Sequence, residues 1–325
     1  MAIPLGDPAG IGPEIVAWAW TRASGAGLPP FFAIGDPASL SAGGFGAWQI
    51  IGSPHDAAGV FPLALPVLPV QGAGIVVPGQ PDAVGARVAL DSLELGVGLV
   101  REGAAGALVT GPIAKANMYE IGFAYPGQTE FVAERCGVAV ENIAMMLVSE
   151  ALTTSPVTIH LALRDVFDAL TTDLIVARGR VVAKALVRDF GIAAPRIAVA
   201  GLNPHAGEGG ALGREEIEII APAVGLLREE GIDARGPLPA DTMFDARARA
   251  TYDAALCMYH DQALVPIKTI AFDEGVNFTA GLPIVRTSPD HGTAFGIAGK
   301  GLARPDAMIA AIRVAAACAA RRMAG

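Results

Sequence analysis

The chain has 325 residues, of which 52% are hydrophobic and 17% are charged, and its formal net charge at pH 7 is −9. This composition excludes a disordered chain, and the length exceeds what one hydrophobic core usually serves, so we expect two domains. The acidic balance argues against nucleic acid and anionic membranes as partners, so an anionic ligand would need a local basic pocket.

The amino terminus and the cysteines favour a soluble, cytoplasmic protein. A secretion signal has a basic segment ahead of its apolar residues, and the opening MAIPLGDPAG has none. Cys136, Cys257 and Cys318 form no CxxC pair, which is typical of reduced thiols in the cytosol. The longest uncharged stretch, Ala57–Pro81, is interrupted by prolines, so it is not expected to be a membrane helix.

The chain begins with a glycine-rich turn, GDPAGIGPE at 6–14, that leads into a helical run. It could be a structural or cofactor-edge turn, or a cradle for phosphate, and the negative charges of Asp7 and Glu14 disfavour the cradle. The elements expected next are strands at Phe31–Ile34, Trp48–Ile51 and Leu65–Val70, a helix at Ala83–Arg101, a strand at Ala107–Thr110 and a helix opening within Pro126–Glu130.

The rest of the chain continues the alternation of buried strands and amphipathic helices. Strands are expected at Ile143–Val148, Pro156–Ile159, Arg196–Ala200 and Ala254–Tyr259, and helices at Thr172–Phe190, Glu215–Glu230 and Pro305–Met323. Helices of this length between strands predict an α/β fold with a mostly parallel sheet.

Three of the five histidines follow predicted buried strands: His160, His205 and His260. Because the carboxyl ends of parallel strands lie along one edge of a sheet, the three imidazoles could converge. Imidazoles from separate strands suit a catalytic divalent metal, zinc in particular. The alternative is that they are structural histidines hydrogen-bonded in loops, since their spacing matches no local metal motif.

Two basic residues, Lys268 and Arg286, lie in otherwise apolar or small-residue segments. A phosphate or carboxylate ligand would satisfy these charges, and salt bridges to nearby carboxylates are the equal alternative. Thr129 either caps the helix that opens within Pro126–Glu130 or binds a ligand. The segment His291-Gly292-Thr293 offers donors and close backbone approach to a cofactor, although this pattern by itself is weak.

Eight segments together resemble one family in order along nearly the whole chain: GDPAGIGPE (6–14), LVTGPIAK (108–115), PGQTEF (126–131), HLALRDV (160–166), LNPHAGEGG (202–210), PLPADTMF (237–244), MYHDQ (258–262) and GLPIVRTSPDHGTA (281–294). The family is 4-hydroxythreonine-4-phosphate dehydrogenase, an oxidoreductase of pyridoxal phosphate (pyridoxine) biosynthesis. The resemblance implies two α/β/α domains like those of isocitrate and isopropylmalate dehydrogenases. It also implies a homodimer with the active site in the cleft and at the interface. The expected division is 1–140 with 280–325 on the cofactor side and 141–279 on the metal and substrate side.

The resemblance also implies roles for individual residues. The metal ligands would be His160, His205 and His260. The substrate contacts would be Gln128, Thr129, Lys268, Asn277 and Arg286. The candidates for the catalytic base are Lys268, Asp241 and Asp261, and the cofactor-binding residues would be Asp290, His291, Gly292 and Thr293.

The implied reaction is NAD- or NADP-dependent oxidation and decarboxylation of 4-phosphooxy-L-threonine to 3-amino-2-oxopropyl phosphate. One divalent metal per subunit is expected, with zinc first and magnesium or cobalt as alternatives. The family usually has histidine where this chain has Gln128, which affects phosphate affinity or its pH dependence. Two other hypotheses are the same chemistry on phosphothreonate or phosphoerythronate, and a three-histidine metal hydrolase without nicotinamide.

Overall fold

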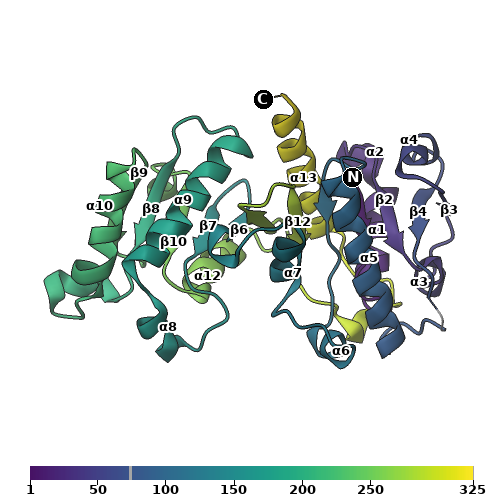
Figure 1. The fold of residues 1–325 in the computed structure, drawn as a ribbon, viewed down its shortest axis with the longest axis horizontal. Helices are drawn as coiled ribbons and strands as arrows, with labels where there is room; N and C mark the ends of the chain where they lie inside the picture. Colours follow the sequence, from purple (N-terminus) through teal and green to yellow (C-terminus); the bar gives the residue numbers. More distant parts are fainter. Residues whose placement is uncertain (73–74, 325) are drawn as a thin grey trace. The chain divides into compact units, whose positions relative to one another are not determined.

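The structure, a computed structural model, describes residues 1–72 and 75–324, so two residues of the uncharged stretch 57–81 lie outside it. Residue contacts divide the chain into two compact units. Unit 1 comprises Met1–Gly137 and Leu282–Ala320, and unit 2 comprises Val138–Gly281 and Arg321–Gly325. Each unit is an α/β fold, and Figure 1 labels most of the elements of both.

Unit 1 is built on strands in the order β3-β4-β2-β1-β5-β12, and every pairing between neighbours of this row is parallel. The strands are β1 (Ala2–Pro4), β2 (Phe32–Gly35), β3 (Trp48–Ile50), β4 (Leu65–Pro69), β5 (Leu108–Val109) and β12 (Arg286–Pro289). The helices are α1 (Gly12–Thr21), α2 (Ala23–Ala26), α3 (Pro37–Ala42), α4 (Ala57–Val60), α5 (Ala83–Arg101), α6 (Lys115–Glu120), α7 (Gln128–Arg135) and α13 (Asp306–Ala324). The buried strands β2 and β1 lie at the centre of this row, as expected for a parallel sheet covered on both faces.

Unit 2 has the strand order β11-β6-β7-β10-β8-β9, in which β6 pairs antiparallel with β11 and β7 and the other pairings are parallel. Its strands are β6 (Ala144–Val148), β7 (Thr153–Pro156), β8 (Arg196–Ala200), β9 (Asp233–Leu238), β10 (Ala254–Cys257) and β11 (Val276–Ala280). Its helices are α8 (Leu163–Ala169), α9 (Thr172–Arg188), α10 (Ala221–Glu229), α11 (Ala246–Arg249) and α12 (His260–Ile270). Helices α9 and α10 pack against each other, and α12 packs on β7 and β10.

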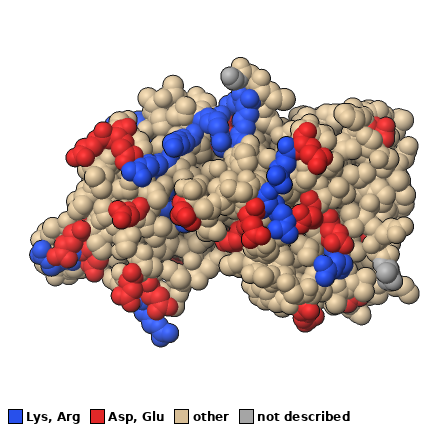
Figure 2. Space-filling view, in the orientation of Figure 1, with Lys and Arg blue, Asp and Glu red and all other residues tan. Residues whose placement is uncertain are grey.

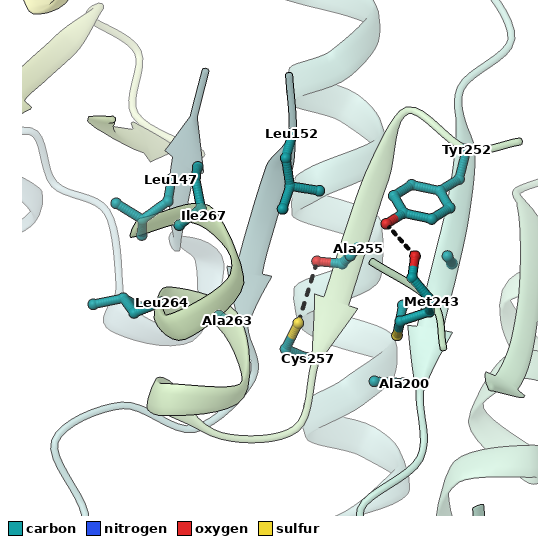
Figure 3. Packing of buried hydrophobic residues seen from close by; sticks show 11 residues of the cluster. Leu147, Leu152, Ala200, Met243, Tyr252, Ala255, Cys257, Ala263, Leu264 and Ile267 are labelled. Atoms are coloured by element: carbon teal, nitrogen blue, oxygen red, sulfur yellow. Dashed lines mark hydrogen bonds between the residues drawn. The ribbon is translucent and has the colours of Figure 1, made fainter. Parts of the chain in front are cut away.

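A hydrophobic cluster fills the space between α12 and the sheet of unit 2 (Figure 3). Leu264 and Ile267 of α12 and Leu147 of β6 lie on one side of the cluster, and Cys257 projects from β10 (Figure 3). At the other side of the cluster the buried Tyr252 hydroxyl donates a hydrogen bond to the Met243 carbonyl oxygen at 2.8 Å, which satisfies its polar end. This packed layer supports the strand ends that carry the histidines.

The α/β class with a mostly parallel sheet is confirmed, but three predicted elements differ in detail. The predicted strand Pro156–Ile159 corresponds to β7, which ends at Pro156. The prediction was displaced because Thr154 and Ser155 are polar but buried, so the sequence of this strand does not look apolar. Their hydroxyls are satisfied by the carbonyl oxygens of Ala263 and Met145. The predicted helix Glu215–Glu230 begins with a π-helical turn, Glu216–Ile220. The predicted strand Ala254–Tyr259 is β10, which ends at Cys257, and α12 begins at His260.

The surface and the thiols agree with the composition. Among the residues described, no helix is long and apolar enough to cross a membrane. On the face shown in Figure 2, Lys and Arg side chains are interspersed with Asp and Glu over a largely uncharged surface. Cys257 and Cys318 are buried and Cys136 is half-buried, none of these three cysteines forms a disulfide in the described structure, and burial raises the pKa of the Cys136 and Cys257 thiols.

Candidate functional site

Arg286 is a buried cation at the beginning of β12 in unit 1. Its side chain is 3% exposed, and its Nη2 donates a hydrogen bond to Thr110 Oγ1 at 2.8 Å. Its Nη1 donates to Thr129 Oγ1 at 3.3 Å. Burial lowers the pKa of Arg286 to about 10, and the negative charge of Glu130 opposes this shift. The guanidinium is therefore charged at neutral pH and is aimed at the beginning of α7.

The first turn of α7 carries Gln128 and Thr129. The residue before the helix is Gly127, and no side chain caps this helix, so the capping interpretation of Thr129 is wrong. Gln128 Nε2 donates a hydrogen bond to the Gly111 carbonyl oxygen at 3.0 Å. Within the described chain Gln128 Oε1 is buried without a hydrogen-bond partner. The free N–H groups of a helix start next to a buried arginine are suited to binding an anion.

The segment Asp290–Thr293 follows β12 and packs against the glycine-rich turn of 6–14. The Ile11 N–H donates to the Thr293 carbonyl oxygen at 3.0 Å. A Cβ atom at Gly10 would lie 3.1 Å from Thr293 Cβ, so the turn needs glycine for this close contact. His291 is exposed, with Nδ1 at 3.1 Å from the Gly292 carbonyl oxygen. The two segments are thus one local structure within unit 1.

Two carboxylates lie inside the glycine-rich turn. Asp7 is 2% exposed and its Oδ1 accepts a hydrogen bond from the Ala9 N–H at 3.0 Å. Burial raises the pKa of Asp7, the Ala9 hydrogen bond opposes this shift, and the charge of Asp82 adds to it. Glu14 is also buried, and its Oε1 accepts a hydrogen bond from the Gly301 N–H at 3.2 Å. A turn with two buried carboxylates is a poor cradle for phosphate, so the structural alternative is favoured.

In unit 2 the fold brings together two histidines that are far apart in the sequence. The imidazole rings of His160 and His260 lie 5.7 Å apart between centroids, with an angle of 40° between their planes. His260 Nδ1 is 2.7 Å from Asp261 Oδ1, which favours a proton on Nδ1 and leaves Nε2 as a donor for a metal. His160 has a backbone φ of 54°, in the left-handed region that non-glycine residues rarely occupy.

His205 begins an unusual run of backbone after β8. Residues 205 to 209 are all left-handed, with φ of 53°, 51°, 78°, 43° and 65°. Three of these residues carry a Cβ atom, and each such residue costs roughly 1–2 kcal/mol in this region. His205 Nδ1 lies 3.1 Å from Glu208 Oε2, so its Nε2 is also left as a metal donor. Backbone strain of this kind is retained where the surroundings over-determine it.

Glu216 supplies much of that support. It is 3% exposed, and its Oε1 accepts hydrogen bonds from the N–H groups of Leu202 at 2.8 Å and Asn203 at 2.7 Å. Its Oε2 accepts a third hydrogen bond from Asn203 Nδ2 at 3.0 Å. A Cβ atom at Gly207 would lie 2.6 Å from Glu216 Oε2, so the left-handed run is packed directly onto this carboxylate.

The three imidazoles of His160, His205 and His260 are chemically suited to a divalent metal, although they do not surround a common point. In the part of the chain that the structure describes, no group of three or more His, Cys, Asp or Glu side chains is arranged to hold a metal ion. His160 and His260 are neighbours, while His205 stands on its own strained loop of the same unit. In His205 and His260 a carboxylate faces Nδ1, which is the usual orientation of metal-ligating histidine.

The other predicted residues of unit 2 have varied environments. Asp261 contacts His260, whereas Asp241 lies exposed in the loop after β9. Lys268 is half-buried, about two turns further along α12 than His260. Asn277 lies in β11, and its Oδ1 is buried without a hydrogen-bond partner among the described residues. Such an orphan acceptor in a native protein calls for a water or ligand donor.

Three buried polar residues that contact the segments carrying the candidate residues were not predicted from the sequence: Thr110, Glu216 and Gln262. Thr110 carried a usable signal, because it is a polar residue at the end of a buried strand, next to Gly111. In the sequence Glu216 lies within an acidic run, and Gln262 lies within the polar segment 260–262. Only tertiary contacts separate these two from ordinary surface residues.

Comparison of the sequence with known proteins identifies the family to which the chain belongs. A family model described as pyridoxal phosphate biosynthetic protein PdxA matches residues 33–315. The 4-hydroxythreonine-4-phosphate dehydrogenase of Caulobacter vibrioides is 56% identical over 327 residues, covering 99% of this chain and 98% of that protein. The enzyme of the same name from Zymomonas mobilis is 55% identical over 324 residues, covering 100% of this chain and 97% of that protein.

A solved structure extends the likeness to the fold. The crystal structure of the 4-hydroxythreonine-4-phosphate dehydrogenase from Klebsiella pneumoniae has a TM-score of 0.88 to this chain at 37% identity. That match covers 98% of this chain and 97% of the solved chain. The motifs singled out in the sequence therefore lie within a match that extends along the whole chain. The chain belongs to the PdxA family of pyridoxal phosphate biosynthetic proteins.

Proposed function

We propose that this protein oxidises 4-phosphooxy-L-threonine with NAD or NADP and releases carbon dioxide and 3-amino-2-oxopropyl phosphate. The observation that carries the proposal is identity of 55% or more, over 99% or more of the chain, to two proteins named for this dehydrogenase activity. Hydride passes from C3 to the nicotinamide and the 3-hydroxyl oxygen loses its proton; the 3-oxo acid that results then loses its carboxyl group as carbon dioxide, and a proton is added at C2 in its place.

The residues of each unit have separate tasks in this proposal. In unit 1, Arg286 and Thr129 bind the phosphate through charge and hydrogen bonding, supported by the N–H groups at the start of α7. The segment Asp290–Thr293 binds the nicotinamide nucleotide, so the range 1–140 with 280–325 is the cofactor side. This assignment is supported by the packing of Thr293 on the turn at Gly10.

In unit 2, within the range 141–279 expected for the metal and substrate side, His160, His205 and His260 hold one divalent metal, zinc first and magnesium or cobalt as alternatives. When bound, the metal lowers the pKa of a coordinated hydroxyl as a Lewis acid, and the nicotinamide accepts the hydride. Lys268 and Asn277 orient the substrate's polar groups. The base that removes the hydroxyl proton is Asp261, Asp241 or Lys268, and the contact of Asp261 with His260 puts it first.

A second candidate keeps the chemistry but changes the substrate to phosphothreonate or phosphoerythronate. Gln128 is the reason to test these substrates, because its side chain is an uncharged amide at the position where the family usually has histidine. Its Nε2 is already bound to the Gly111 carbonyl oxygen, and its Oε1 is an acceptor. Gln128 is therefore poorly placed to add attraction for a phosphate dianion, so Arg286 carries more of that task.

The test is to mix the purified protein with 4-phosphooxy-L-threonine, NAD or NADP and a divalent metal, and to follow the absorbance of reduced nicotinamide. A rise that a chelator abolishes supports the proposal. No rise with this substrate but a rise with phosphothreonate or phosphoerythronate would transfer the function to the second candidate. No rise with any of them would reject the dehydrogenase.

The metal ligands and the assembly have their own tests. His160→Ala, His205→Ala and His260→Ala should each lower metal content measured by elemental analysis, and undiminished content in all three would show that the site is misplaced. We also propose a homodimer whose active site lies at the interface and a cytoplasmic location. Sedimentation equilibrium and cell fractionation test these two points, and a monomer or a membrane-bound fraction would contradict them.

A further inference from the structure

Lys115 is the first residue of α6 in unit 1 and the last residue of the sequence motif LVTGPIAK. Its side chain is exposed. A Cβ atom built on Gly127, the residue before α7, would lie 3.7 Å from Lys115 Cε and 3.9 Å from Lys115 Nζ. The ammonium group therefore lies beside the first turn of α7, which carries Gln128 and Thr129.

The loop that leads to Lys115 is held by hydrogen bonds on two sides. The Pro112 carbonyl oxygen accepts a hydrogen bond from the Asp7 N–H at 3.0 Å. The Gly111 carbonyl oxygen accepts the 3.0 Å bond from Gln128 Nε2. Lys115 thus extends from a loop that is tied both to the glycine-rich turn and to α7, which limits the entropy lost when its side chain binds a ligand.

Two cations from different elements flank the first turn of α7. Arg286 reaches this turn from β12 and donates to Thr129 Oγ1 at 3.3 Å, and Lys115 reaches it from α6. Glu130 is the acidic residue of the turn, and its Oε2 lies 3.3 Å from the Cβ position of Gly127. The three charged side chains together carry one positive charge, to which the start of a helix adds the equivalent of about half a charge.

In the protein without a ligand, this position of Lys115 is electrostatically unfavourable. The N–H groups of a first turn form the positive end of the helix dipole, which repels an ammonium group. No side chain caps α7 by accepting hydrogen bonds from these N–H groups. In the part of the chain that the structure describes, Lys115 has no ion-pair partner within 4.0 Å. A phosphate dianion at this point would attract both cations and accept hydrogen bonds from the N–H groups.

We propose that Lys115 is a further substrate-binding residue of unit 1, whose ammonium group binds the substrate's phosphate together with Arg286 and the first turn of α7. This inference rests on the proposed function, because it takes the start of α7 as the phosphate site. Lys115 supplies a charge that Gln128 lacks, since the Gln128 amide is neutral and its Nε2 already donates to the Gly111 carbonyl oxygen. A lysine ammonium is a point charge with three donors, which suits phosphate oxygens.

The test is the dissociation constant of 4-phosphooxy-L-threonine and of inorganic phosphate, each measured by isothermal titration calorimetry without nicotinamide, so that no turnover occurs. Lys115→Met keeps most of the side-chain stem but removes the charge, and both dissociation constants should rise about 10-fold, as for the loss of one hydrogen bond to a charged group. Lys115→Arg keeps the charge and should retain most of the affinity. If Lys115→Met does not fold, Lys115→Gln replaces it.

The matched control is Lys184→Met. Lys184 is an exposed lysine of α9 in unit 2, so this variant removes the same charge from the surface of the other unit. It should bind both ligands as the parent does, which shows that any loss in Lys115→Met is local and does not come from the change in net charge.

Thermal unfolding separates a binding role from a structural one. Because the ammonium group lies beside the positive end of α7, Lys115→Met should keep or raise the melting temperature of the ligand-free protein. The rise in melting temperature that inorganic phosphate produces should be smaller in Lys115→Met than in the parent. A residue that only held α6 in place would give the opposite pair of results, and these would overturn the inference.

The other failures are distinguishable. A folded Lys115→Met protein that binds inorganic phosphate as tightly as the parent, or an equal loss in Lys184→Met, would overturn the inference while the proposed function stands. If the parent binds inorganic phosphate through Lys115 but does not bind 4-phosphooxy-L-threonine, the inference holds and the proposed substrate is wrong. If the parent binds neither ligand, the phosphate site of the proposed function fails and the inference with it.

Discussion

The Arg286 guanidinium donates a hydrogen bond of 2.8 Å to the Thr110 hydroxyl inside unit 1, and both side chains are almost fully buried. Thr110 directly follows β5 and Arg286 begins the adjacent strand β12, where Arg286 pairs with Leu108. The Thr110 hydroxyl therefore contacts the Arg286 guanidinium at the end of β5, and the Thr129 hydroxyl contacts it from α7. This contact connects the sequence motif LVTGP to the proposed phosphate site.

Thr110→Val should weaken binding of the phosphorylated substrate without disturbing the fold. The change keeps the side-chain volume but removes an acceptor from a charged donor, a bond of about 1.5–3 kcal/mol. We expect KM to rise about 10-fold or more with kcat changed less than about threefold, measured by steady-state kinetics. The control is Thr287→Val in β12, next to Arg286, because the Thr287 hydroxyl donates a hydrogen bond to the Ala311 carbonyl oxygen at 2.9 Å. Equal KM values for Thr110→Val and the parent would remove Thr110 from the site.

Two glycines of the left-handed run provide a matched pair of substitutions. Gly207 (φ 78°) lies against the Glu216 carboxylate, whereas Gly209 (φ 65°) has open space around its missing Cβ. Gly209→Ala should lower the free energy of unfolding by about 1 kcal/mol, the cost of a left-handed alanine. Gly207→Ala should lower it by clearly more than that, because the methyl group also displaces Glu216. Urea denaturation measures both, and similar values would show that the contact at Gly207 relaxes without consequence.

Glu216→Gln should loosen the loop that carries His205. A glutamine presents one acceptor oxygen where the carboxylate serves the N–H groups of Leu202 and Asn203 and the Asn203 amide, so at least one buried donor loses its acceptor. The expected loss is about 1–3 kcal/mol in the free energy of unfolding. Glu215→Gln is the control, because the Glu215 side chain accepts one bond from Asn203 that a glutamine oxygen can also accept. An unchanged unfolding midpoint in Glu216→Gln would mean that the loop is held elsewhere.

Asp7→Asn should stabilise the protein at neutral pH. Burial raises the pKa of Asp7 above the ordinary value of 3.8, so the folded state holds this proton more tightly than the unfolded chain does. By linkage, stability is lost as pH rises from the unfolded pKa through the folded pKa, and the full penalty of ionisation remains above it. Asparagine keeps an acceptor for the Ala9 N–H without that penalty, so its advantage should be greatest at pH 7 and shrink as pH approaches 3.8.

Urea denaturation at several pH values checks this prediction. Asp36→Asn is the control, since Asp36 Oδ1 caps α3 by accepting a hydrogen bond from Ala38 at the surface, and asparagine caps equally well. A lower stability of Asp7→Asn at pH 7 would show that an attractive partner outweighs the burial of the charged carboxylate.

The sequence by itself determined the class of the fold. Strands such as Arg196–Ala200 and Ala254–Cys257 are short apolar runs that can only be interior, and the helices between them show a 3.6-residue period, so an α/β fold with a mostly parallel sheet follows. Where polar residues are buried, as at Thr154 and Ser155, the periodic signal failed and the predicted strand was displaced along the chain. Their hydroxyls are compensated by contacts that a local pattern cannot contain.

Only the tertiary structure decided how the candidate residues are oriented. The sequence marked three histidines after strands, but it held no information on the ring contact of His160 with His260 or on the left-handed run at His205. It also gave no sign that Gln262 and Glu216, which look like surface residues, are buried supports of those loops. The physical reason is that periodicity reports which face of an element is apolar, whereas the direction of a polar side chain depends on hydrogen bonds to residues far away in the chain.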